Sequence, residues 1–205
     1  LAVTGDFTIE SGGSFIQNGT LNAASKTAER AITAANWADP LDGWHLISSP
    51  VASQAISGDW TPTGAGNDYD FYAWSEPDNE WKNQKVSENG IITFNVGQGY
   101  NVSYQQSGTK SFTGDFNTAD VTANLTNSSS GFNLLGNPYP SALVWGTGWT
   151  LGNVQATAYA WNRATRSYTD ITTGDPIPAH NGFMVYTQAA QNLTIPAAAR
   201  DHNAQ

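Results

Sequence analysis

The sequence predicts an all-β fold, and three observations support this prediction. Short runs rich in Thr, Val, Ile, Phe, Tyr and Trp alternate with clusters of Gly, Pro, Asn, Asp and Ser, a pattern typical of strands separated by turns. Only Ala23–Ala35 has a helix-forming composition, and its small apolar face predicts a weak helix or an extended connector. The chain also resembles itself, which indicates an internally duplicated, pseudo-twofold β-sandwich or a flattened barrel.

The internal repeat is visible in three matched segments. Residues 43–50 read GWHLISSP and residues 131–138 read GFNLLGNP, so an aromatic residue, two aliphatic residues and a proline recur 88 positions later. The other matches are Tyr72-Ala73-Trp74 with Tyr159-Ala160-Trp161, and Gln98–Val102 with Asn181–Val185.

This repeat sets the expected domain organisation. Residues 39–205 should form the duplicated sandwich, with a first copy at about 43–125 and a second at about 131–205, both contributing strands to a common core. Residues 1–38 should form a separate β extension, either the last coil of a β-solenoid or a hairpin. Its glycines recur every seven residues between apolar residues, at Gly5, Gly12 and Gly19.

Each copy should contain one hairpin and one special glycine. Polar segments at 75–80 and 162–167 follow the matched Tyr-x-Trp pairs and predict the two hairpin turns. The Tyr and Trp of each pair are two residues apart, so they project from the same face of a strand. Gly99 and Gly182 each precede an apolar run and predict a bend or bulge at the start of a strand.

Composition and charge exclude several classes of function. The net charge of −9 opposes binding to nucleic acid and to anionic lipid surfaces, and no apolar run is long enough for a spanning helix. The absence of cysteine excludes disulfide scaffolds, Cys-ligated metals and thiol catalysis. A polar chain rich in Asn, Ser, Thr, Gly and Gln is typical of an extracellular or cell-surface protein.

The second copy carries motifs that resemble a known family. Residues 131–145, 159–162 and 177–183 are similar to the pattern GWNLIGNPYPSALDW, YVWN and IPAGQGFFV. This pattern is found in large secreted surface proteins of Bacteroidetes, upstream of type IX secretion sorting domains. The resemblance covers residues 43–205, and residues 6–21 resemble coils that precede such modules. It implies export and a place in a multidomain adhesive or polysaccharide-processing protein, with other domains of that protein as partners.

The sequence contains no strong catalytic constellation. There is no Gly-x-Ser-x-Gly motif, and His45 and His180 are best explained as a structural residue and a surface-loop residue. Glu76 and Glu80 flank a turn, where a solvated hairpin explains them better than the acid and nucleophile of a glycosidase. We therefore expect no catalytic residues, and a glycan-active hydrolase or lyase is the second alternative.

Calcium is the only metal that the acidic residues suggest. Asp68 and Asp70 lie two apart on an extended segment, so their carboxylates would share one side, and oxygen ligands suit this ion. No EF-hand loop is present, and we expect no other cofactor.

The high aromatic content indicates carbohydrate binding, because the chain has eight Trp and eight Tyr but few charged residues. An indole ring offers a flat platform for the C–H face of a sugar, and Asn, Gln and Asp supply hydrogen bonds. Aromatic residues matched in both copies are expected to form the core, whereas unmatched ones remain free for a ligand. The predicted ligand-binding residues are Trp37, Trp60, Tyr69, Trp145 and Trp149.

The function predicted from the sequence is therefore a non-catalytic, extracellular accessory module that binds a polysaccharide or another glycan. The first alternative is a structural or adhesive spacer in a large surface protein. Neither nucleic acid nor membrane insertion is expected.

Overall fold

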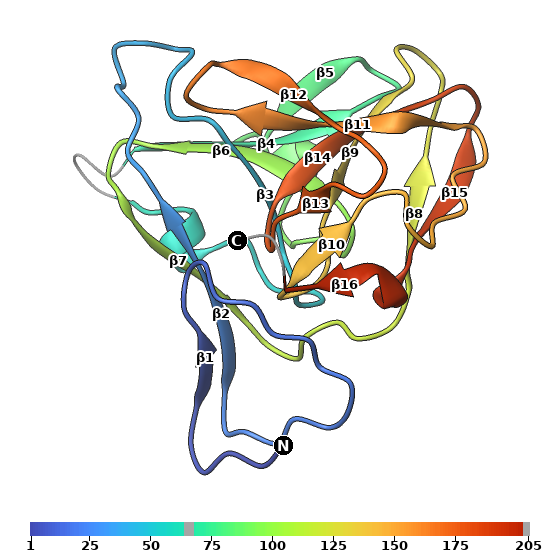
Figure 1. Ribbon diagram of the computed structural model, residues 1–205. Coiled ribbons are helices and arrows are strands. Elements are labelled where there is room, and N and C mark those ends of the chain that lie inside the picture. Colours follow the sequence, from blue (N-terminus) through green and yellow to red (C-terminus); the bar gives the residue numbers. More distant parts are fainter. Residues whose placement is uncertain (64–67, 203–205) are drawn as a thin grey trace.

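The computed structural model describes residues 1–63 and 68–202, and within them the protein is all-β (Figure 1). This confirms the predicted fold class. The segment expected to be a weak helix or a connector contains a strand, β2 (Lys26–Ile32). The helical segments of the described chain are single 3-10 turns: η1 (Gly58–Trp60), η2 (Ser87–Asn89) and η3 (Ala197–Ala199).

Two four-stranded antiparallel sheets dominate the fold, and their strand orders correspond. The first sheet has the order β3 (His45–Ser48), β6 (Gly99–Tyr104), β4 (Tyr69–Ser75), β5 (Glu80–Asn83). The second has the order β9 (Phe132–Gly136), β14 (Gly182–Thr187), β11 (Val154–Asn162), β12 (Ser167–Ile171). Each strand of the first sheet thus has a counterpart at the same position in the second. Both sheets are open at their edges in the described residues, as in a sandwich and unlike a barrel.

Smaller sheets complete the second half of the molecule. One pairs β8 (Val121–Leu125) with β15 (Gln191–Ile195). The other has the order β13 (Pro176–Ile177), β10 (Ala142–Val144), β16 (Arg200–Asp201).

The N-terminal extension projects from the body of the molecule (Figure 1). Strand β1 (Phe7–Ile9) pairs in parallel with β2, which pairs on its other side with β7 (Gly108–Thr113). A hairpin would be antiparallel, so the parallel pairing fits the solenoid-like alternative. Phe7 and Phe15 pack against Phe116, which joins the extension to the first half of the molecule.

The molecule has two separate cores, which corrects the expectation of one common core. The first is centred on Phe71, Phe94 and Phe112, and the second on Leu143 and Phe183. The two four-stranded sheets meet at a third, small cluster, in which three buried residues are flanked by half-buried aromatic rings. Those three residues are Leu46, Leu134 and Met184.

The contacts between the two sheets follow the pseudo-twofold symmetry. The amide of Ser48 donates to the carbonyl of His180 at 2.9 Å, and the amide of Gly136 donates to the carbonyl of Gly97 at 2.9 Å. A Cβ added to Gly99 would lie 2.4 Å from the carbonyl oxygen of Leu135 in the other half. Glycine is therefore required there because two backbones approach closely. The pairing of β6 with its two neighbours shows no register shift, so the strand has no bulge at this position.

Candidate functional site

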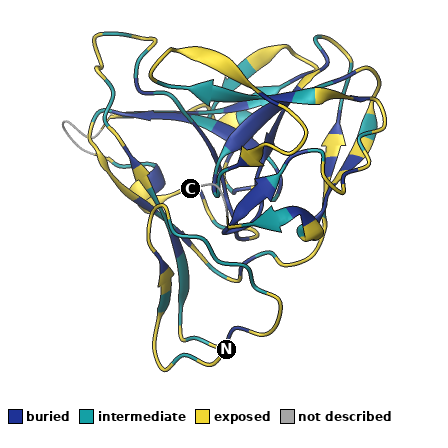
Figure 2. Ribbon diagram, in the orientation of Figure 1, coloured by how far each residue is buried: buried dark blue, intermediate teal, exposed yellow. Residues whose placement is uncertain are grey.

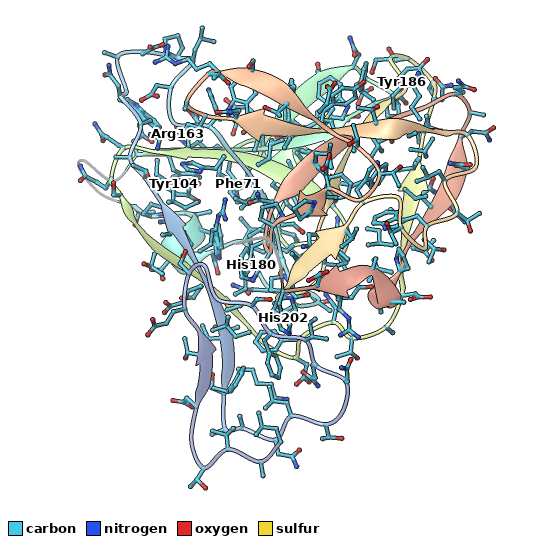
Figure 3. The ribbon with its side chains drawn as sticks, viewed as in Figure 1. Phe71, Tyr104, Arg163, His180, Tyr186 and His202 are labelled. Carbon is cyan, nitrogen blue, oxygen red and sulfur yellow. The ribbon has the colours of Figure 1, made fainter. Side chains whose placement is uncertain are left out.

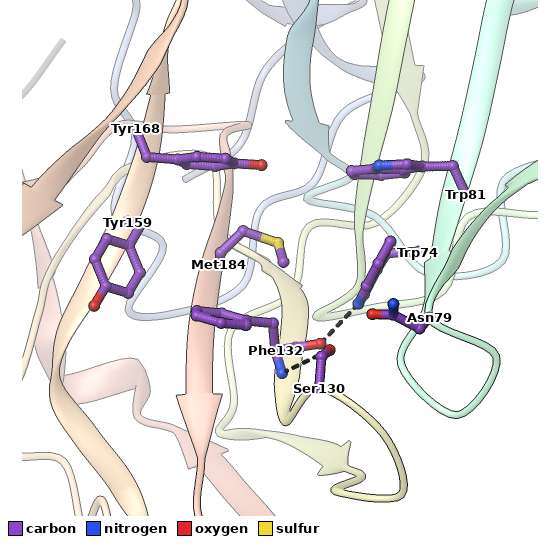
Figure 4. A pocket seen from close by; sticks show the side chains of 8 residues that line it. All are labelled: Trp74, Asn79, Trp81, Ser130, Phe132, Tyr159, Tyr168 and Met184. Atoms are coloured by element: carbon purple, nitrogen blue, oxygen red, sulfur yellow. Dashed lines mark hydrogen bonds between the residues drawn. The ribbon is translucent and has the colours of Figure 1, made fainter.

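The facing surfaces of the two four-stranded sheets form a cleft lined with aromatic rings. It comprises two adjoining pockets, which we name after residues at equivalent places in the repeat. The Phe132 pocket has a volume of about 460 Å³ and is lined by Trp74, Asn79, Trp81, Ser130, Phe132, Tyr159, Tyr168 and Met184 (Figure 4). The Trp44 pocket has a volume of about 320 Å³ and is lined by Leu41, Trp44, Leu46, Tyr72, Trp81, Asn101, Trp161 and Tyr168. We call the two together the aromatic cleft.

The predicted hairpins position the central rings of the cleft. In the first sheet, Trp74 of β4 lies opposite Trp81 of β5, with ring centroids 5.2 Å apart. In the second, Trp161 of β11 lies opposite Tyr168 of β12, with centroids 5.3 Å apart. Trp81 and Tyr168 extend toward one another from the two sides of the cleft, over Met184 (Figure 4). These cross-strand pairs stabilise both hairpins while exposing part of each ring.

Alternation along the strands explains why these rings face the cleft. In β4, Phe71 and Ala73 are buried in the first core, so Tyr72 and Trp74 project from the opposite face. That face meets the other sheet, and the indole N–H of Trp74 donates to the carbonyl of Phe132 at 2.7 Å. The sequence correctly placed each Tyr-x-Trp pair on one face, but the face is that of the cleft and not of a core.

The unmatched tryptophans, predicted to be ligand platforms, are mostly buried. Trp60 packs in the first core against Phe112, and its indole N–H donates to the carbonyl of Ser111. Trp145 and Trp149 pack against each other in the second core, and their indole N–H groups donate to backbone carbonyls. The prediction that these three rings are free for a ligand was wrong, because they fill the cores of their own halves. Buried segments of the ribbon lie mainly in the body of the molecule, and exposed ones are frequent in its loops and N-terminal extension (Figure 2).

The remaining predicted platform residues lie outside the cleft. Trp37 is 37% exposed but lines neither pocket. Tyr69 is half-buried, stacks on Tyr104, and donates from its hydroxyl to Gln84. Neither ring contributes to the aromatic cleft.

Asp68 and Asp70 face an ammonium group. The Nζ of Lys85 lies 3.1 Å from a carboxylate oxygen of Asp68 and 4.0 Å from one of Asp70. The hydrogen bond from Lys85 lowers the pKa of Asp68. Across residues 1–63 and 68–202, no group of three or more acidic or histidine side chains is placed to hold a metal ion. The pair therefore provides no structural argument for calcium.

The turn of each hairpin holds the segment that leads into the other copy. The carboxylate of Glu76 accepts hydrogen bonds from the amides of Ser128, Ser129 and Gly131, at 2.7–3.0 Å. Burial opposes its ionisation, but these N–H donors outweigh burial and lower the pKa of Glu76 to about 2. At the equivalent place, the guanidinium of Arg163 donates to the carbonyl of Ala34.

The hydrogen bonds of Glu76 and Arg163 position the segments that form the rim of the cleft. The segment held by Glu76 carries Ser130 and leads into Phe132, whereas the segment beside Arg163 leads toward Leu41 and Trp44.

Glu76 is a structural carboxylate, because it is 3% exposed and accepts hydrogen bonds from backbone donors. Glu80 is paired with Lys82 on the exposed edge strand. Glu76 and Glu80 are therefore not arranged as the acid and nucleophile pair of a glycosidase.

His180 is buried and His45 is half-buried. His180 is 1% exposed and lies inside the molecule (Figure 3), so the expected surface position was wrong. Burial, with a smaller contribution from Arg30, lowers the pKa of His180 to about 3. Burial also lowers the pKa of His45 to about 4. Both side chains are neutral at pH 7, and neither lines the aromatic cleft.

A family model matches residues 1–199, which is nearly the whole chain. The chain belongs to the family described as Domain of unknown function (DUF8693). No curated protein matches the chain, and no solved structure does. The family description names no activity, so the resemblance to Bacteroidetes surface proteins stays a prediction. In the described residues, no helix has both the length and the apolar character to cross a membrane.

Proposed function

We propose that this chain is a non-catalytic carbohydrate-binding module of an extracellular protein, and that the aromatic cleft is its binding site. The observation that carries the proposal is the cleft itself, because partly exposed Trp, Tyr and Phe rings from both sheets converge on one concave surface. Its pockets fall near the lower end of the range typical of small-ligand sites, about 300–1,000 Å³.

The polar groups at the cleft suit a sugar ligand. Asn79 stands at the hairpin turn beside Trp74, and its side chain forms no hydrogen bond with the described residues (Figure 4). The Ser130 hydroxyl, which accepts a 3.4 Å hydrogen bond from Phe132, retains its own proton for donation. A pyranose ring could stack its apolar face on the aromatic rings while its hydroxyl groups bond to this rim.

Affinity electrophoresis provides the test. The protein would be run through gels that contain hydroxyethylcellulose, xyloglucan, galactomannan or starch, and tested in pull-downs with insoluble cellulose and chitin. We expect at least one glycan to retard or retain the protein, and Trp81→Ala to abolish that effect.

Trp37→Ala is the matched control, since it removes an exposed indole that lines neither pocket. It should leave binding unchanged, and near-UV circular dichroism should show that both variants stay folded. Absence of binding to every glycan would overturn the proposal and favour a structural spacer. Binding that survives Trp81→Ala in a folded protein would overturn the assignment of the cleft.

A further inference from the structure

We infer that the aromatic cleft binds one neutral glycan chain across two unequal subsites, the Phe132 pocket and the Trp44 pocket. The inference rests on the proposed function, and adds the charge class of the ligand and the way in which it is held. Three observations support it: the equivalence of the pockets, the differences between them, and the chemistry of their walls.

The pockets are related by the internal repeat through most of their lining residues. Trp44 and Tyr72 have ring centroids 5.9 Å apart at an interplanar angle of 61°, and the equivalent Phe132 and Tyr159 have centroids 6.2 Å apart at 61°. The central rings are shared, since Trp81 and Tyr168 line both pockets. A ligand that fills both pockets therefore passes these two rings, which favours one continuous chain over two separate ligands.

The floors of the pockets differ in polarity. Met184 lines the Phe132 pocket, whereas Asn101 lies at the equivalent place in the Trp44 pocket. The indole N–H of Trp74 is bonded to a carbonyl, but its counterpart in Trp161 has no partner among the described residues. The side-chain oxygen of Asn101 is also buried without a partner there.

Buried polar atoms without partners are uncommon, because leaving them unsatisfied is unfavourable. In the Trp44 pocket, one such donor and one such acceptor occur together. Hydroxyl groups of a ligand can accept from Trp161 and donate to Asn101, once the side chains that cover these two atoms shift. Leu41, which lines this pocket, is 63% exposed. This pocket thus suits the more polar contact, and the Phe132 pocket suits stacking.

The walls of both pockets favour a ligand without charge. Among the described residues, those that line them include no Asp, Glu, Lys, Arg or His. An ionic group enclosed by these aromatic walls would lose hydration without gaining a counter-charge. The net charge of −9 also repels polyanions. Neutral polysaccharides are therefore favoured over polyuronates and sulfated glycans.

Isothermal titration calorimetry on the full chain tests the inference. The ligands would be the disaccharide and hexasaccharide of whichever neutral polysaccharide retards the protein most, with polygalacturonate as the anionic probe. We expect one hexasaccharide to bind per protein, at least about tenfold more tightly than the disaccharide, and no binding of polygalacturonate.

The informative variant is Asn101→Met, which places the side chain of one pocket in the equivalent place of the other. It should weaken hexasaccharide binding about tenfold, a fold-change that matches the loss of one or two hydrogen bonds. The melting temperature should stay the same or rise, because an unsatisfied polar group is removed. Asn192→Met on the exposed face of β15 is the control and should change neither quantity.

The outcomes separate this inference from the proposed function. If no neutral glycan binds, the proposed function fails, and the inference with it. If a glycan binds with two hexasaccharides per protein, without a gain over the disaccharide, or unaffected by Asn101→Met, the two-subsite inference is overturned while the proposed function stands. Equal binding of polygalacturonate would overturn the charge class alone.

Discussion

The buried carboxylate of Glu76 provides the sharpest test of how the two halves are held together. Glu76→Gln keeps the size of the side chain but replaces one acceptor oxygen by an NH2 group. That group would face the amides of Ser128, Ser129 and Gly131, which are themselves donors. The variant would thus lose charge-assisted hydrogen bonds and also bury unsatisfied donors.

The expected magnitude follows from the contacts. A hydrogen bond to a charged group contributes about 1.5–3 kcal/mol, and Gln retains one oxygen that can still accept. We therefore expect the free energy of unfolding to fall by about 3 kcal/mol. For a chain of this size each kcal/mol lowers the melting temperature by about 2–4 °C, so the shift should be roughly 6–12 °C.

The effect should depend on pH in a defined direction. The folded-state pKa of Glu76 is about 2, below its ordinary value of 4.5, so the ionised carboxylate stabilises the fold above about pH 4.5. This stabilisation is lost as the pH falls toward 2. The difference in stability between the wild type and Glu76→Gln should therefore be constant above about pH 5 and shrink below it.

Urea denaturation at a series of pH values, followed by tryptophan fluorescence, would measure both effects. Glu80→Gln is the control, because Glu80 lies on the same hairpin but is exposed and forms a surface ion pair with Lys82. A loss below about 1 kcal/mol at pH 7, or a difference that does not change with pH, would refute the structural role assigned to the Glu76 carboxylate.

Two further predictions concern the junction of the two sheets and the buried histidine. Gly99→Ala should lower the free energy of unfolding by about 3 kcal/mol in urea denaturation, because its Cβ would lie 2.4 Å from the carbonyl oxygen of Leu135. Gly108→Ala, where a Cβ meets nothing within 4 Å, should change it by less than about 0.5 kcal/mol; equal effects would contradict the close approach. The pKa of His180 falls from 6.5 to about 3 on folding, so lowering the pH from 7 to 5 should cost about 2 kcal/mol through this group. His180→Asn, which tolerates the φ of 59°, should remove that part of the pH dependence, and an unchanged slope of unfolding free energy against pH would contradict it.

The sequence alone predicted the all-β class, the two hairpins, and the strand face shared by each Tyr-x-Trp pair. These features are local, because turn residues and two-residue alternation act over a few positions. The repeat also located the equivalent strands, since β3 and β9, or β4 and β11, keep the same sequence pattern. The parallel coil of the N-terminal extension remained one of two alternatives, because glycine spacing does not fix the direction of pairing.

Which aromatic rings are buried was decided only by the tertiary structure. All rings matched in both copies were expected in the core. The matched pair Tyr100 and Phe183 does lie in the two cores, but other matched rings, such as Trp74 and Trp161, line the surface where the two sheets meet. Unmatched rings, such as Trp60 and Trp145, fill the separate cores. The physical reason is that both copies contribute the same residues to the pseudo-twofold junction, whereas each core keeps only part of the shared set and fills the rest of its volume with residues of its own. Sequence periodicity assigns a residue to one face of a strand, and only the packing of the sheets shows what that face meets.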